Sequence, residues 1–100
     1  MTLTKRIQRW ETEWAKARAR WAIFVRKDDY FNTGVASELH LKALARMTYC
    51  EDKFMQVLFD ARNRGDLTQA QVEAQIWESY PRVVNTSDGL IEGYYHDKSS

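Results

Sequence analysis

The sequence predicts an all-α fold, and three observations support this class. Proline and glycine, which disfavour helix interiors, are rare: the 100 residues include one proline and four glycines. Apolar residues recur at helical spacing in three segments, 2–29, 35–64 and 68–80. Capping or turn residues lie at the segment boundaries. We therefore predict a small three-helix antiparallel bundle with two long helices, one short helix and a C-terminal tail or small β-hairpin.

The first predicted helix, residues 2–29, carries an unbroken heptad pattern of apolar residues. The apolar positions follow one another at alternating steps of 4 and 3 residues, which is the a/d spacing of a helix that buries one seam. We call this set the Trp seam: Leu3, Ile7, Trp10, Trp14, Ala17, Trp21 and Phe24. Tryptophan is bulky for a two-stranded coiled coil. The simplest expectation is that the Trp seam packs inside the bundle, and the alternative is a homodimer that shares it.

The same predicted helix carries a row of cations on the side that faces away from the Trp seam. At 100° per residue, these cations fall within an arc of about 60°. We call this set the basic stripe: Lys5, Arg9, Lys16, Arg20 and Lys27. No acidic residue lies within the arc, although Glu13 flanks it. The basic stripe is either a solvated helix face or a surface that binds phosphates or an acidic protein.

The second predicted helix, residues 35–64, has a main apolar face and further apolar residues outside it. The main face holds Ala36, His40, Ala43, Met47, Cys50, Phe54, Val57 and Ala61. The residues outside it are Leu39, Leu41, Met55 and Phe59. A helix that is apolar on more than one side is typical of a sandwiched or oligomeric position. Gly65 fits the left-handed position just past the helix end.

The third predicted helix has the clearest start signal, because Thr68 and Gln71 form a capping box. We predict that it ends at Tyr80, since Pro81 disfavours the helical conformation of the residue before it. Its expected buried residues are Ala74, Ile76, Trp77 and Tyr80. Residues 1–80 would then form the bundle domain. Residues 81–100 would pack on it or extend from it as a tail, or as a hairpin that turns at Asp88-Gly89.

The composition predicts a cytoplasmic protein. The single cysteine, Cys50, excludes an intrachain disulfide and fits a reducing compartment. The longest apolar run, Trp21 to Val25, is far too short to cross a bilayer. We therefore expect no membrane span.

No residue pattern predicts a catalytic, cofactor or metal site. His40 and Cys50 are ten residues apart on one predicted helix, about 15 Å along its axis, so they cannot form a nucleophile–base pair. Two histidines and one cysteine in separate segments give no metal-ligand cluster. No glycine-rich phosphate loop occurs. We expect a non-enzymatic protein that needs no cofactor.

The expected function is therefore the binding of another protein. We expect a small helical regulator or inhibitor that is itself a homo-oligomer, most simply a homodimer. Small single-domain regulators of phage and mobile elements commonly have this build. One alternative is nucleic-acid binding through the basic stripe. Only the first helix could make this contact, because residues 68–80 contain two glutamates and no cation and would repel a duplex. A second alternative is membrane-surface binding through the amphipathic N-terminal helix.

Overall fold

The computed structural model describes the backbone of residues 1–99 and the side chains of residues 1–94. These residues form four helices and no strand, which confirms the all-α class. The helices are α1 (Leu3–Lys27), α2 (Tyr30–Thr33), α3 (Glu38–Asn63) and α4 (Gln69–Ser99). The molecule measures about 47 × 28 × 21 Å along its three principal axes.

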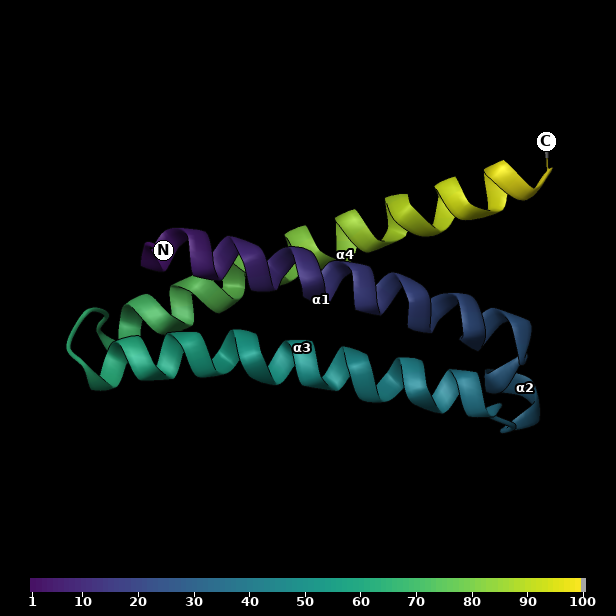
Figure 1. The fold of residues 1–100 in the computed structure, drawn as a ribbon, viewed down its shortest axis with the longest axis horizontal. Coiled ribbons are helices and arrows are strands. Elements are labelled where there is room, and N and C mark those ends of the chain that lie inside the picture. The colour runs from purple at the N-terminus through teal and green to yellow at the C-terminus, as the bar shows by residue number, and fades with distance from the viewer. Residues whose placement is uncertain (100) are drawn as a thin grey trace.

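The central element of the fold is α1, which packs against both α3 and α4. α3 returns antiparallel to α1, and α4 then runs parallel to α1 (Figure 1). α4 lies close to α3 only near the turn that joins them, and from there it rises away from α3. The three long helices therefore meet at one end of the molecule, which we call the closed end. At the other end, the open end, α3 and α4 are splayed apart.

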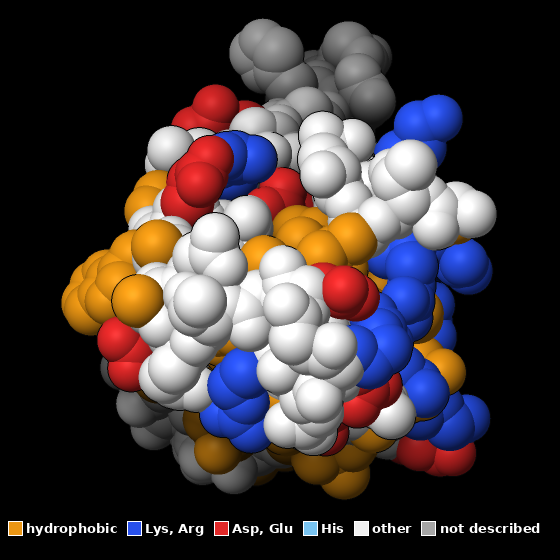
Figure 2. Space-filling view, turned by 90° about the vertical axis from the view of Figure 1, so that its left-hand side faces the viewer, with side chains coloured by type: hydrophobic (Ala, Val, Ile, Leu, Met, Phe, Trp, Pro, Cys, Tyr) orange, Lys and Arg blue, Asp and Glu red, His pale blue; other side chains and the backbone are white. Residues whose placement is uncertain are grey.

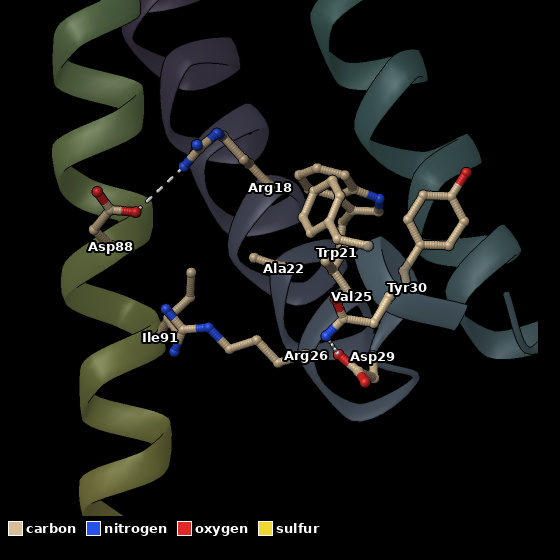
Figure 3. Close-up of a pocket in the computed structure, with 11 residues that line it drawn as sticks. Arg18, Trp21, Ala22, Val25, Arg26, Asp29, Tyr30, Asp88 and Ile91 are labelled. Atoms are coloured by element: carbon tan, nitrogen blue, oxygen red, sulfur yellow. Dashed lines mark hydrogen bonds and ion pairs between the residues drawn. The ribbon is translucent and has the colours of Figure 1, made fainter. Parts of the chain in front are cut away.

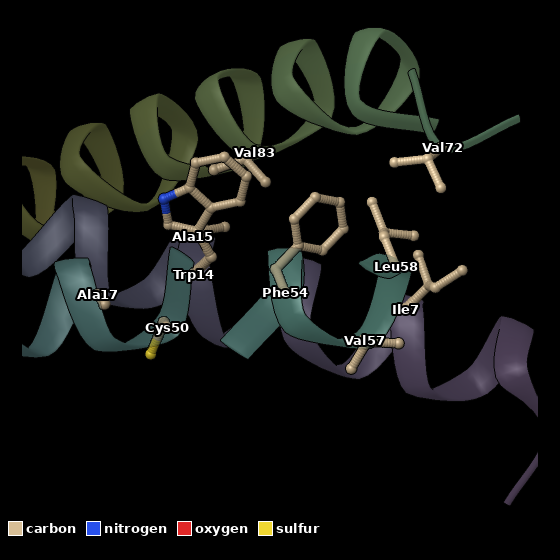
Figure 4. Packing of buried hydrophobic residues seen from close by; sticks show 10 residues of the cluster. All are labelled: Ile7, Trp14, Ala15, Ala17, Cys50, Phe54, Val57, Leu58, Val72 and Val83. Carbon is tan, nitrogen blue, oxygen red and sulfur yellow. The ribbon is translucent and has the colours of Figure 1, made fainter. Parts of the chain in front are cut away.

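The hydrophobic core lies where the three long helices meet (Figure 4). α1 contributes Trp14, whose ring centroid is 5.4 Å from that of Phe54 in α3 and 6.1 Å from that of Tyr80 in α4. The core residues are Ile7, Trp14, Ala15, Ala17, Cys50, Phe54, Val57, Leu58, Val72 and Val83. Every long helix contributes to this cluster, so it fixes the positions of all three.

The helix starts follow their capping residues. The Gln71 backbone N–H donates to Thr68 Oγ1 at 3.1 Å, and the Thr68 backbone N–H donates to Gln71 Oε1 at 2.8 Å, which confirms the predicted capping box. Gly65 has the predicted left-handed backbone, with φ of 84°. α3 begins three residues later than predicted, at Glu38, because Ser37 accepts the backbone N–H of His40 and caps the helix there.

The prediction that the third helix ends before Pro81 is wrong. α4 runs through Pro81 as far as Ser99, so residues 81–99 form neither a tail nor a hairpin. Proline removes the hydrogen bond to the carbonyl four residues earlier, here that of Trp77. Both residues are exposed to solvent, where water can hydrate the free carbonyl. Beyond the proline, Val83 and Ile91 pack the helix onto α1, and this packing outweighs the local cost.

The predicted buried face of this helix is also wrong. Trp77 is 80% exposed and Tyr80 is 53% exposed, Ala74 is exposed, and Ile76 is half-buried. The buried positions instead are Val72, Ser79, Val83, Ser87 and Ile91. From Ser79 onward they recur every four residues, which is helical spacing. Two of them are serines, so the pattern is not visible as an apolar stripe.

Candidate functional site

The splay of α3 and α4 leaves a cleft at the open end of the bundle, about 590 Å³ in volume (Figure 3). We call it the open-end cleft. Trp21, Ala22 and Val25 of α1 line its floor, and Ile91 lies across from them on α4. The rim and the α2 side hold Arg18, Arg26, Asp29, Tyr30, Phe31, Asn32 and Asp88. Such a volume lies within the range of ligand and partner clefts in proteins.

α2 places a large aromatic side chain at the edge of the open-end cleft. The Phe31 side chain lies on this one-turn helix and is 82% exposed. Hydrogen bonds hold this turn in place, because Asn32 Nδ2 donates to Asp29 Oδ1 at 2.8 Å and Thr33 Oγ1 donates to the Asp28 carbonyl at 3.1 Å. The Phe31 ring is therefore presented to solvent by an ordered segment.

The rim of the open-end cleft carries two arginines, Arg18 and Arg26, and two aspartates, Asp29 and Asp88. Arg18 Nη1 donates to Ser87 Oγ at 2.5 Å and lies 3.4 Å from Asp88 Oδ1. This ion pair joins α1 to the part of α4 that has moved away from α3. The rim thus has both signs of charge and no net charge.

A polar contact between α1 and α4 sets the position of α4 along α1. Glu11 is buried, and its carboxylate accepts the hydroxyl of Ser79 and lies 3.5 Å from Arg82 Nη1. Gln75 donates to the same carboxylate at 3.5 Å. A buried carboxylate must be hydrogen-bonded or ion-paired, so sliding α4 along α1 would expose or orphan Glu11.

A second polar cluster joins the C-terminal end of α1 to the start of α3. Asp28 Oδ2 accepts the backbone N–H of Ser37 at 3.0 Å and its hydroxyl at 2.9 Å, and lies 3.0 Å from His40 Nδ1. The backbone hydrogen bond from Ser37 is the main cause that holds the pKa of Asp28 below its ordinary value, and the Ser37 hydroxyl and His40 lower it further. His40, predicted on the main face of its helix, is buried in this corner.

This cluster predicts a specific pH dependence of stability. Because the folded-state pKa of Asp28 lies below 3.8, its ionised form stabilises the fold above that pH and loses this effect as the pH falls through the lowered pKa. Asp28→Asn should therefore lower the free energy of unfolding at about pH 5 and have a smaller effect at about pH 3. Urea unfolding at both pH values measures the difference, with Asp52→Asn on the exposed face of α3 as the control. An Asp28→Asn effect that does not shrink in acid would contradict the assignment.

The structure places the Trp seam residues at different depths. Ile7, Trp14 and Ala17 are buried between α1 and its neighbours in the same chain. Leu3, Trp10, Trp21 and Phe24 are half-buried. Trp10 contacts Tyr49 of α3 edge to face, with ring centroids 6.2 Å apart. Trp21 lines the open-end cleft, so one Trp seam residue takes part in a surface that the heptad pattern did not reveal.

All five basic stripe residues are exposed. In the part of the chain that the structure describes, none of them forms an ion pair. Among the described residues, the cations that pair with carboxylates include Arg18, Lys42, Arg46, Arg64 and Arg82. Lysine and arginine side chains gather along one side of the molecule in Figure 2, and hydrophobic side chains are exposed on the opposite side. The fold therefore leaves the charge of the basic stripe uncompensated.

Two candidate groups from the sequence do not come together. Cys50 is fully buried in the core, and burial raises the pKa of its thiol. His40 lies in the corner with Asp28 instead. Among residues 1–94, no group of three or more His, Cys, Asp or Glu side chains is placed to hold a metal ion. In the same described part, no helix has the length and apolar character needed to cross a bilayer.

Comparison with protein-family models, curated proteins and solved structures finds no significant match to this chain.

Proposed function

We propose that this chain is a non-enzymatic binding protein that acts as a homodimer, in which two copies join at their open-end clefts. In this proposal the protein acts by protein–protein contact, as regulators and inhibitors do, and catalyses no reaction. The observation that carries the proposal is the 82% exposed Phe31 ring beside an apolar cleft on the same surface.

The position of Phe31 suits a two-fold symmetric interface. In such an interface the same patch is used by both copies, so a residue at the edge of a cleft can enter the partner's cleft while receiving the partner's residue in its own. The cleft, at about 590 Å³, is larger than a single aromatic side chain. Trp21 and Ala22, which are half-buried, provide apolar surface that the inserted ring would cover.

The charges on the rim fit a second copy and disfavour a strongly acidic or strongly basic partner. Each rim carries two arginines and two aspartates. A two-fold axis places the rim of one copy against the same rim of the other, so cations can face anions in both directions. A strongly acidic or strongly basic partner would leave half of these charges against groups of their own sign.

The test compares two exposed aromatic residues on different surfaces. We expect Phe31→Ser to weaken the dimer about 30-fold or more, because aromatic residues inserted in a pocket are the usual hot spots of interfaces. Trp77→Ser is the matched control, since Trp77 is 80% exposed on α4 and does not line the cleft. Sedimentation equilibrium measures the dissociation constant of each variant. A dimer that Trp77→Ser disrupts and Phe31→Ser leaves intact would place the interface elsewhere and contradict the proposal.

A further inference from the structure

The basic stripe lies beside aromatic rings that the fold brings to the same face. The Arg9 guanidinium lies 5.3 Å from the centroid of the Trp10 ring. Tyr49 of α3 contacts Trp10 edge to face and is 46% exposed. Lys53 Nζ and the Arg46 guanidinium lie 5.5 Å and 5.2 Å from the centroid of the Tyr49 ring. The sequence did not predict this cluster, because three of its five residues come from α3.

A similar arrangement occurs at the other end of α1. The Phe24 ring lies between two basic stripe residues, with Arg20 and Lys27 at 5.6 Å and 5.8 Å from its centroid. Lys27 also lies 5.7 Å from the centroid of the Tyr94 ring of α4. Cations, with rings beside Arg9, Arg20 and Lys27, thus extend along about 33 Å of α1, as given by the helical rise from residue 5 to residue 27.

A hollow of about 230 Å³ opens next to Trp10 on this face. Arg6, Lys53 and Gln56 line it, together with Trp10 itself, and supply hydrogen-bond donors around an aromatic wall. Asp60 also lines the hollow and is its one acidic group. The nearby Glu13 is compensated, since Arg46 Nη2 lies 3.7 Å from its carboxylate.

We propose that this face, made of the basic stripe with Trp10, Tyr49 and Phe24, binds single-stranded nucleic acid. Unpaired cations in a row can follow the phosphates. The exposed Tyr49 ring can stack on a base, and the half-buried Trp10 and Phe24 rings lie on the same face. Cations together with stacking rings are the usual combination in single-strand binding surfaces. A duplex would hide its bases from the rings, so a single strand fits this face better than a duplex. This surface is separate from the open-end cleft, so the two proposals can fail independently.

The test is fluorescence anisotropy with a labelled single-stranded oligothymidylate of about 15 nucleotides, near the upper end of single-strand site sizes. If all five basic stripe residues contact phosphates, the logarithm of the binding constant should fall with the logarithm of the salt concentration with a slope of about −3.5. Lys16→Glu with Arg20→Glu should abolish binding at moderate salt. The control, Arg62→Glu with Ala74→Glu and Asn85→Glu, makes the same change in net charge at exposed sites of α3 and α4 away from this face and should bind nearly as wild type.

Tyr49→Ala separates base stacking from simple attraction of anions. It should weaken oligonucleotide binding about 5- to 150-fold and leave the affinity for heparin, which has no bases, unchanged. Circular dichroism of each variant checks that it is folded. The proposal is overturned if a duplex of equal length binds as tightly as the single strand, if Tyr49→Ala has no effect, or if anionic vesicles bind and the oligonucleotide does not.

Discussion

Replacing Trp14 with alanine is expected to lower the free energy of unfolding by about 3–5 kcal/mol. The Trp14 side chain is 5% exposed and contacts rings from both α3 and α4, so its removal leaves a cavity at the point where the three long helices meet. A small domain has only about 5–15 kcal/mol of stability in total. Urea unfolding at a fixed protein concentration, followed by circular dichroism, measures the change.

Trp77→Ala is the matched control for this experiment. Trp77 is 80% exposed, and substitutions at exposed sites usually change stability by less than about 0.5 kcal/mol. If Trp14→Ala destabilised the protein no more than Trp77→Ala, the Trp seam would not be the core of a single chain. A Trp14→Ala protein that kept its stability and lost its dimer would place the Trp seam between chains instead.

The sequence predicts the starts of α1 and α4 because the signals are local. Thr2 accepts the backbone N–H of Lys5, and Thr68 forms its capping box with Gln71, in both cases within one turn. Hydrophobic periodicity likewise places Phe54 and Val57 on the buried face of α3. Local hydrogen bonds and helical spacing can be deduced from neighbouring residues without knowledge of the fold.

The C-terminal half of α4 could not be predicted in this way. A proline and an Asp-Gly pair both disfavour a helix locally, and the packing of Val83, Ser87 and Ile91 on α1 outweighs them. Ser79 and Ser87 are buried because Glu11 and Arg18 of α1 bond to them. These partners are about 70 residues away in the chain. From the sequence alone, the helix face that holds the two serines is therefore expected to be exposed to solvent.

The open-end cleft could not be predicted either, because it depends on where α4 leaves α3. The Trp seam locates a buried face, and it does not reveal that Trp21 lies where the third helix has moved away. The basic stripe can be read from the sequence. Its aromatic neighbour Tyr49 comes from α3 and is placed there by tertiary packing.

Ala22→Arg is expected to convert the dimer to a monomer. Ala22 is half-buried on the floor of the open-end cleft, so an arginine there fills the space that the partner's Phe31 would occupy. Its long side chain can keep the charged group in water, and the fold should therefore survive. The control is Ala45→Arg. It is the same substitution within α3, away from the helix ends, at a solvent-exposed position outside the cleft.

The most direct measurement of the central claim is the mass in solution by light scattering coupled to size-exclusion chromatography. The wild-type protein and Ala45→Arg should elute at twice the chain mass of 11.8 kDa, and Ala22→Arg at the chain mass, with unchanged helix content. A wild-type protein that stays at the chain mass at every concentration would contradict the claim, as would an Ala22→Arg protein that still forms the dimer.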